Sequence, residues 1–264
     1  MATTTKMLME KDGPLGWLIF NQPEKRNAVS QEMWQAVPEM VRELEEDHDI
    51  RVIILRGAGD QAFVAGADIS QFKDRRRNMD DELEYRRISW QGSQALTSIQ
   101  KPLLAMIQGY CVGGGVGIAM TCDIRIASDD ARFGIPAARL GLGYHYDGIE
   151  KLMHLIGPSH VLDIFFSART DYSAQEALRM GLVNYVVPKA ELESFTRQHA
   201  LRIAANAPLT QRTAKATVRE LLRPPEARDL AKLDKMLAEC FNSEDYQEGV
   251  RAFSEKRRPV FKGR

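Results

Sequence analysis

The chain has 264 residues, 44% of them hydrophobic and 27% charged, and its 36 basic side chains balance 36 acidic ones. This length is enough for one or two domains with a sizeable core. A formal net charge of zero gives no support for nucleic-acid binding, and no stretch approaches the roughly 20 apolar residues that cross a bilayer. The first residues lack the apolar run of a secretory signal, so we expect a cytoplasmic protein with no membrane partner. Three cysteines without metal-ligand spacing predict reduced thiols and no metal site.

Strand and helix patterns alternate through the first two-thirds of the chain. Continuous apolar runs predict buried strands at residues 15–20, 52–55, 103–107 and 124–127. Between them, apolar residues at helical spacing predict helices over residues 30–44 and 89–99. Ser30 has the side chain of an N-cap for the first helix, and Pro38 within that helix can kink it. This order of elements predicts an α/β protein with right-handed crossovers.

The pattern changes near residue 190. Helices are predicted over residues 191–206, 208–222, 226–241 and 243–256, with prolines at two of the breaks. A charged helical segment of this kind cannot form a core alone, so we expect it to pack on its own sheet domain or on a neighbouring subunit. The predicted organisation is therefore a core at residues 1–190 followed by a helical region at residues 191–264.

Two small-residue segments stand where a backbone amide can face a ligand. Gly113, Gly114 and Gly115 follow an apolar strand and open an apolar helix. Glycines at such a turn let the backbone approach a ligand, and the start of a helix has unpaired N–H groups. The alternative is that these glycines permit tight packing of helix on sheet. The segment from Ala65 to Ala67 has the same two interpretations, a ligand contact or a plain turn. The triple glycine matches neither a phosphate loop nor the spacing of a dinucleotide fingerprint.

Seven segments carry motifs in order along the chain, at residues 21–28, 57–69, 113–115, 122–127, 131–136, 181–184 and 243–249. Together they resemble the crotonase superfamily, which includes enoyl-CoA hydratases and isomerases. The resemblance implies a spiral of ββα units with a C-terminal helical trimerisation region, assembled as a homotrimer or a dimer of trimers. It also implies an acyl-CoA thioester substrate, partly covered by the helical region, and no cofactor apart from the coenzyme A of that substrate.

The resemblance also implies roles for individual residues. The backbone N–H groups of Ala67 and Gly114 are expected to form an oxyanion hole for the thioester carbonyl, and one such donor is typically worth about 3 kcal/mol. The path of the nucleotide and pantetheine is expected to be lined by Ala28, Ala65, Asp68 and Ile69, with Lys25 or Arg26 near its entrance. The alternative for the two basic residues is a solvated turn. A basic stretch that includes Arg75, Arg76 and Arg77 corresponds to a cover over the acyl end, and it can attract anionic acyl-CoAs.

Two departures from the family pattern bear on the reaction. Hydratases of the family carry glutamates where this chain has Gly117 and Ala137. Because a glycine and a methyl group cannot transfer protons, we do not expect hydration or isomerisation by the usual carboxylates.

The turn that follows Ala137 offers replacements. It contains Tyr144, His145 and Asp147, and Tyr144 stands at the position of a tyrosine in methylmalonyl-CoA decarboxylases of the family. Histidine can act as acid or base near neutral pH, and Asp147 can orient it. Our leading hypothesis is a lyase that decarboxylates a malonyl-type CoA thioester. The alternatives are a hydratase or hydrolase that uses His145 and Asp147, and an inactive acyl-CoA-binding paralogue. The structural alternative is that the tyrosines fill the space left by the glutamates and His145 lies at the surface.

Overall fold

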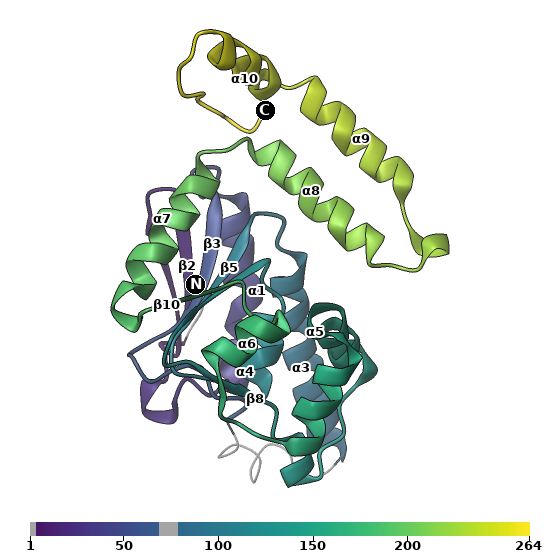
Figure 1. The fold of residues 1–264 in the computed structure, drawn as a ribbon. Coiled ribbons are helices and arrows are strands. Elements are labelled where there is room, and N and C mark those ends of the chain that lie inside the picture. Colours follow the sequence, from purple (N-terminus) through teal and green to yellow (C-terminus); the bar gives the residue numbers. More distant parts are fainter. Residues whose placement is uncertain (1–3, 69–78) are drawn as a thin grey trace.

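A computed structural model describes residues 4–68 and 79–264, which form two sheets surrounded by helices (Figure 1). The larger sheet has six strands in the order β1-β2-β3-β5-β7-β10. All neighbours are parallel except β1 and β2. The four predicted strands are confirmed and occupy the centre of this sheet, and sequence reasoning missed both edges. The strands are β1 (Met7–Asp12), β2 (Leu15–Phe20), β3 (Val52–Gly57), β5 (Leu103–Ile107), β7 (Ile124–Ser128) and β10 (Tyr185–Val187).

The smaller sheet has four short strands in the order β4-β6-β8-β9. They are β4 (Ala62–Val64), β6 (Tyr110–Val112), β8 (Arg132–Gly134) and β9 (Tyr172–Ser173). β4, β6 and β8 are parallel, and β9 runs antiparallel to β8. Because β4 and β6 are parallel neighbours, the segments that follow their carboxyl ends emerge at the same edge of the sheet. These are the two small-residue segments singled out from the sequence.

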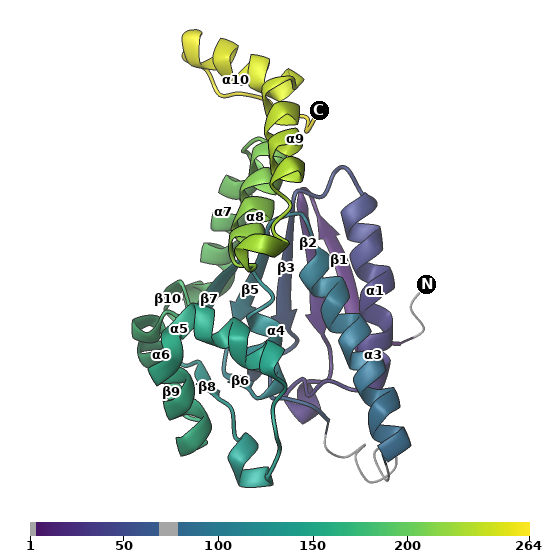
Figure 2. The ribbon, with the colours of Figure 1, turned by 90° about the vertical axis from the view of Figure 1, so that its right-hand side faces the viewer.

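Helices cover both faces of the larger sheet (Figure 2). α1 (Gln31–Glu46) and α3 (Met79–Ser98) lie side by side on one face, and α7 (Leu192–Ala204) packs on the other. Ser30 caps α1 as predicted, accepting a hydrogen bond from the amide of Met33, and α1 continues through Pro38 to Glu46. The remaining elements of the body are α4 (Gly114–Ala119), α5 (Tyr146–Ser167), α6 (Ala174–Met180) and the 3-10 turns η1 (Pro23–Lys25), η3 (Ala137–Leu140) and η4 (Lys189–Glu191).

The last helices project from the body, and α8 and α9 lie side by side (Figures 1 and 2). They are α8 (Pro208–Leu221), η5 (Pro225–Ala227), α9 (Leu230–Phe241) and α10 (Glu244–Ser254). Lys215 ties α8 to the body, since its ammonium donates to the Lys101 carbonyl at 2.8 Å and to Asp123 at 2.6 Å. The helices predicted beyond residue 190 are therefore present. The division at residues 190 and 191 stays a prediction, and α7 itself makes its contacts with the sheet.

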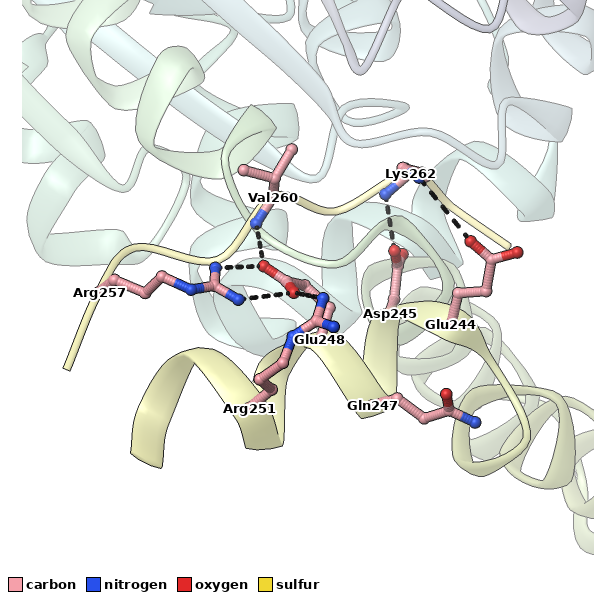
Figure 3. Close-up of a pocket in the computed structure, with 8 residues that line it drawn as sticks. All are labelled: Glu244, Asp245, Gln247, Glu248, Arg251, Arg257, Val260 and Lys262. Atoms are coloured by element: carbon pink, nitrogen blue, oxygen red, sulfur yellow. Dashed lines mark hydrogen bonds and ion pairs between the residues drawn. The ribbon is translucent and has the colours of Figure 1, made fainter. Parts of the chain in front are cut away.

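The C-terminal residues fold back over α10 (Figure 3). Asp245 accepts hydrogen bonds from the amides of Lys262 and Gly263 at 2.6 and 2.8 Å. Glu248 accepts from Arg257 and Arg251, and these guanidinium groups hold the pKa of its carboxyl well below the usual range. Tail and helix enclose a cavity of about 430 Å³ with a mixed charged lining of Glu244, Asp245, Gln247, Glu248, Arg251, Arg257, Val260 and Lys262.

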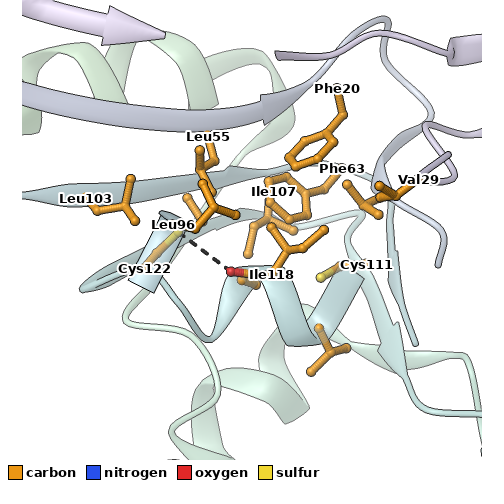
Figure 4. Packing of buried hydrophobic residues seen from close by; sticks show 14 of the residues in the cluster. Phe20, Val29, Leu55, Phe63, Leu96, Leu103, Ile107, Cys111, Ile118 and Cys122 are labelled. Carbon is orange, nitrogen blue, oxygen red and sulfur yellow. Dashed lines mark hydrogen bonds between the residues drawn. The ribbon is translucent and has the colours of Figure 1, made fainter. Parts of the chain in front are cut away.

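The main core lies between the larger sheet, the smaller sheet and the helices α1, α3 and α4. Side chains alternate along the central strands, so that Phe20 and Leu55 face this core while Trp17 and Ile54 face α7. Figure 4 shows its centre, where Phe20 of the larger sheet meets Phe63 of the smaller sheet edge to face, with ring centroids 6.2 Å apart. Burial of this core fixes the smaller sheet, and with it the loops at its edge, against the rest of the body.

Candidate functional site

The ends of β4 and β6 bring the backbone amides of Ala67 and Gly114 close together. A Cβ built on Gly114 would lie 3.8 Å from the amide nitrogen of Ala67, and a Cβ built on Gly66 would lie 3.9 Å from that of Gly114. Gly114 opens α4, so its N–H has no acceptor within the helix. Among the described residues, neither amide donates to another group of the chain. This arrangement is the one that the predicted oxyanion hole needs.

A second loop holds the Ala67 segment in place. The amide of Ala65 donates to the Arg26 carbonyl at 3.0 Å, and the amide of Val29 donates to the Gly66 carbonyl at 2.8 Å. The amide of Asp68 in turn donates to the Val29 carbonyl at 3.0 Å. These bonds flank Ala67 on both sides. The direction of its own N–H is therefore fixed, and no described residue accepts a hydrogen bond from it.

Asn27 joins this second loop to the sheet, and sequence reasoning gave it no role. It is fully buried. Its side-chain amide donates to the carbonyls of Ala58 and Ala62 at 2.9 and 2.8 Å, and its oxygen accepts from the amide of Gln22 at 3.0 Å. The only signal in the sequence is an amide side chain within a charged turn. The sequence does not show that this side chain is buried or that its hydrogen bonds are made.

The three glycines of the segment at residues 113–115 differ in their structural roles, and contact of the segment with a ligand stays a prediction. Gly113 has φ 56° and ψ −116°, a conformation that side chains rarely adopt, and it turns the chain from β6 into α4. Gly115 is needed for packing, because a Cβ there would lie 2.0 Å from the carbonyl oxygen of Val64. Gly114 has neither constraint, since a Cβ there would meet its neighbours at ordinary contact distances of 3.7 Å or more. Its amide, and not its missing side chain, is the feature of interest.

A matched pair of alanine substitutions on α4 tests this packing. We expect Gly115→Ala to destabilise the fold by at least about 1–3 kcal/mol, because the methyl group collides with rigid backbone. Gly117→Ala is expected to leave stability unchanged or raise it by about 0.5–1 kcal/mol, because alanine favours the helix. Thermal unfolding of both variants measures the difference. Equal midpoints would contradict the packing described for α4.

The residues expected along the coenzyme A path lie in the same two loops. The ammonium of Lys25 donates to the buried carboxylate of Asp68 at 2.9 Å, and Gln22 donates to the same oxygen at 3.2 Å. Arg26 is exposed, with its guanidinium 4.5 Å from the centre of the Tyr110 ring. Ala28 and Ala65 are half-buried. Asp68 is thus the buried partner of Lys25, and its place in a coenzyme A path stays a prediction. Ile69 and the basic stretch Arg75–Arg77 lie outside the described residues.

The positions of the missing acids differ in their surroundings. Gly117 is exposed, and a Cβ there would meet no heavy atom of the described residues within 4 Å. Ala137 is buried in the main core with Val116 and Ile118. Neither position supplies a proton carrier.

The three replacement residues gather at the start of α5. The Nδ1 atom of His145, the N-cap residue of this helix, lies 3.1 Å from a carboxylate oxygen of Asp147, and both side chains are exposed. Tyr144 is 39% exposed and packs edge to face on Phe165, with ring centroids 5.0 Å apart. This partial burial raises the pKa of Tyr144 above its usual value, so that the phenol stays protonated at neutral pH. In the part of the chain that the structure describes, no hydrogen bond joins these residues to Ala67 or Gly114. Their catalytic roles stay predictions.

Neither a metal cluster nor a membrane helix is found within residues 4–68 and 79–264. No three of their His, Cys, Asp and Glu side chains are grouped to hold a metal ion, and none of their helices is long and apolar enough to cross a bilayer. The cavity on α10 lies far from α4 in both views of the molecule. It is therefore not part of the site at β4 and β6.

The three cysteines are free. Cys111 and Cys122 are buried, whereas Cys240 is partly exposed. Burial raises the pKa of Cys122 from 9.0 to about 12 and that of Cys111 still further. At pH 8 we expect a thiol reagent to modify Cys240 in the native protein and all three cysteines after denaturation. Because the two buried thiols stay protonated while unfolded thiols ionise near pH 9, their contribution to stability is complete below pH 9 and declines as the pH rises towards 12. Rapid native labelling of Cys122 would contradict this burial.

The comparisons with known proteins agree with this arrangement. The sequence profile described as enoyl-CoA hydratase/isomerase matches residues 11–264. A short-chain-enoyl-CoA hydratase of Clostridium acetobutylicum is 35% identical over 96% of this chain and 95% of its own length. A crotonyl-CoA hydratase of Syntrophomonas wolfei is 32% identical over 97% of both chains. The crystal structure of an enoyl-CoA hydratase/carnithine racemase from Magnetospirillum magneticum superimposes with a TM-score of 0.94 at 32% identity, over 99% of this chain and 97% of that one. The expected fold class is thereby confirmed, and the chain belongs to the enoyl-CoA hydratase/isomerase family of the crotonase superfamily.

Proposed function

We propose that this protein adds water to the double bond of an enoyl-CoA thioester, with His145 and Asp147 as its acid–base pair. The observation that carries the proposal is the 3.1 Å contact between these two side chains. Hydration needs a base for the attacking water, and an oriented imidazole is the group that the chain offers in place of the family glutamates. The relatives' names support the reaction class, since the two described above are hydratases.

The proposed reaction divides the work between backbone and side chains. The amides of Ala67 and Gly114 donate to the thioester oxygen, and His145 donates its Nδ1–H to Asp147, which leaves the lone pair of Nε2 available. Nε2 takes a proton from water as the water oxygen bonds to C3, and the electrons of the double bond move to the thioester as an enolate. The imidazolium then returns the proton to C2. The two amides hold the negative charge between these steps.

Decarboxylation, our leading hypothesis from the sequence, receives less support. It needs no base to begin, and His145, paired with Asp147, would serve only as the acid that protonates the enolate after carbon dioxide has left. The family comparisons also name hydratases rather than decarboxylases. The protonated hydroxyl of Tyr144 remains suited to orienting a substrate carboxylate, and for this reason carboxylated substrates belong in the test.

The test is to incubate the purified protein with saturated, unsaturated and carboxylated acyl-CoAs and to measure product masses. Gain of one water on an enoyl-CoA is the expected result. Loss of carbon dioxide from a malonyl-type thioester would replace the proposal by decarboxylation, and release of free coenzyme A would replace it by hydrolysis. If no substrate changes mass although acyl-CoA binds, the chain is a binding paralogue.

The projecting helices supply an argument for self-association. They expose large apolar side chains, each at least half exposed: Val218, Leu221, Leu222, Leu230, Leu237, Phe241, Val250 and Phe253. A second and third copy of this chain would bury them, as expected for a trimer or a dimer of trimers. Light scattering after size-exclusion chromatography should give three or six times the 29.8 kDa chain mass. A monomer at micromolar concentration would contradict this part of the proposal.

A further inference from the structure

The two sides of α4 differ sharply in what they carry. Four of its six residues, Gly115, Val116, Ile118 and Ala119, are buried in the body, and the other two, Gly114 and Gly117, are exposed. The exposed side of this helix therefore consists of two glycines three positions apart. It presents bare backbone at the place where the free amide of Gly114 lies.

From this bare face we infer that Gly117 determines which acyl group the site accepts, by leaving room for a branched or aryl substituent beside the thioester carbon. The inference rests on the proposed binding of an acyl-CoA at the amides of Ala67 and Gly114. It goes beyond the reaction itself, because it assigns a substrate class to a residue that has no side chain to take part in chemistry.

Helix geometry places the space at Gly117 next to that carbon. Residues three apart share a face, and each Cα–Cβ bond tilts towards the N-terminus of the helix. A side chain at position 117 would therefore extend over the turn that contains the Gly114 amide. The structure leaves room at this point, since a Cβ built on Gly117 meets no described heavy atom within 4 Å. With the thioester oxygen on the amide, the carbons next to the carbonyl lie beside this volume.

The segment near this space is apolar. The strand β8 ends beside the start of α4, because the amide of Gly113 donates to the carbonyl of Gly134 at 2.8 Å, and the chain continues from there to Ala137. Leu140, Leu142 and Tyr144 follow at alternate positions, and they are 62%, 44% and 39% exposed. Large apolar side chains left partly exposed in the segment that follows β8 favour an apolar occupant. A hydrocarbon branch or a phenyl ring fits this lining better than a second charge.

Binding measurements with saturated acyl-CoAs test the inference without requiring turnover. Dissociation constants for acetyl-, isovaleryl- and phenylacetyl-CoA are measured by calorimetry for the wild type, Gly117→Ala and Gly117→Leu. Because a methylene too many in an apolar site costs about 10- to 200-fold in discrimination, Gly117→Leu should weaken the two bulky ligands by about tenfold or more. Acetyl-CoA should change less than about threefold, and Gly117→Ala should lie between.

Free coenzyme A is the internal control, since it does not reach Gly117 and should bind all three proteins equally. Equal weakening of acetyl-CoA and the bulky ligands, or no change for any of them, would overturn the inference. If the Gly117 variants show the expected size dependence but the wild type hydrates no enoyl-CoA, only the proposed reaction is contradicted. The two failures are therefore distinguishable.

Discussion

Replacing Gly114 by proline should lower kcat by about 100- to 1,000-fold, because it removes one of the two N–H groups proposed to hold the enolate oxygen. The substitution suits the local backbone. Gly114 is the first residue of α4, where proline is favoured and where the N–H makes no helical bond. A Cβ at this position meets its neighbours at 3.7 Å or more. The loss should therefore come from the missing donor, and circular dichroism should show an unchanged fold.

Gly114→Ala is the matched control for this proline variant. It adds a side-chain carbon at the same position and keeps the N–H, so its kcat should fall by less than about tenfold while the proline variant loses a further tenfold or more. Steady-state kinetics of both variants on the enoyl-CoA that the mass assay identifies provide the measurement. If alanine and proline lower kcat equally, steric blocking explains the effect and the amide has no special role.

The second large effect is expected at His145. His145→Ala should lower kcat by about 10²- to 10⁴-fold, because the attacking water loses its base. Asp147→Asn should lower it less, since the imidazole remains and loses only the carboxylate that orients it. The double variant should be hardly worse than His145→Ala, because both residues serve one proton transfer. Affinity for coenzyme A should be unchanged in all of them.

His154→Ala is the matched control for this series. His154 is exposed on the same helix, α5, and has no role in the proposed reaction. Its substitution should leave kcat within about twofold of the wild type, as expected for a surface change away from the site. If His145→Ala also retains wild-type kcat, the pair at the start of α5 is structural, and Tyr144 or a group outside the described residues carries the proton.

The sequence predicted the elements whose pattern is long enough to repeat. The central strands of the larger sheet are continuous apolar runs. α1 could be predicted from the helical spacing of its apolar residues and from Ser30 at its N-cap. The strands of the smaller sheet are two or three residues long, too short for any period to be visible. Yet this sheet brings the two amides together. The amide segments themselves could be recognised because they depend on small residues in a fixed local order.

The sequence alone could not predict which polar side chains are buried or which distant residues they contact. Asn27 sits in a motif of charged residues and is fully buried, because its amide satisfies three backbone groups of separate segments. Asp68 was expected to line a ligand path, and it also forms a buried partner for Lys25. In both cases the role depends on segments that are distant in the chain. The pairing of His145 with Asp147, by contrast, was anticipated because the two residues are local neighbours.

The most direct test of the oxyanion site is the infrared spectrum of a bound, unreactive acyl-CoA that carries carbon-13 at its thioester carbonyl. Two hydrogen bonds from Ala67 and Gly114 polarise that carbonyl, so its stretching band should move to lower frequency on binding to the wild type. The shift should shrink with Gly114→Pro and persist with Gly114→Ala. A band that keeps its solution frequency when bound, or a shift that Gly114→Pro leaves intact, would contradict the claim that these two amides receive the thioester oxygen.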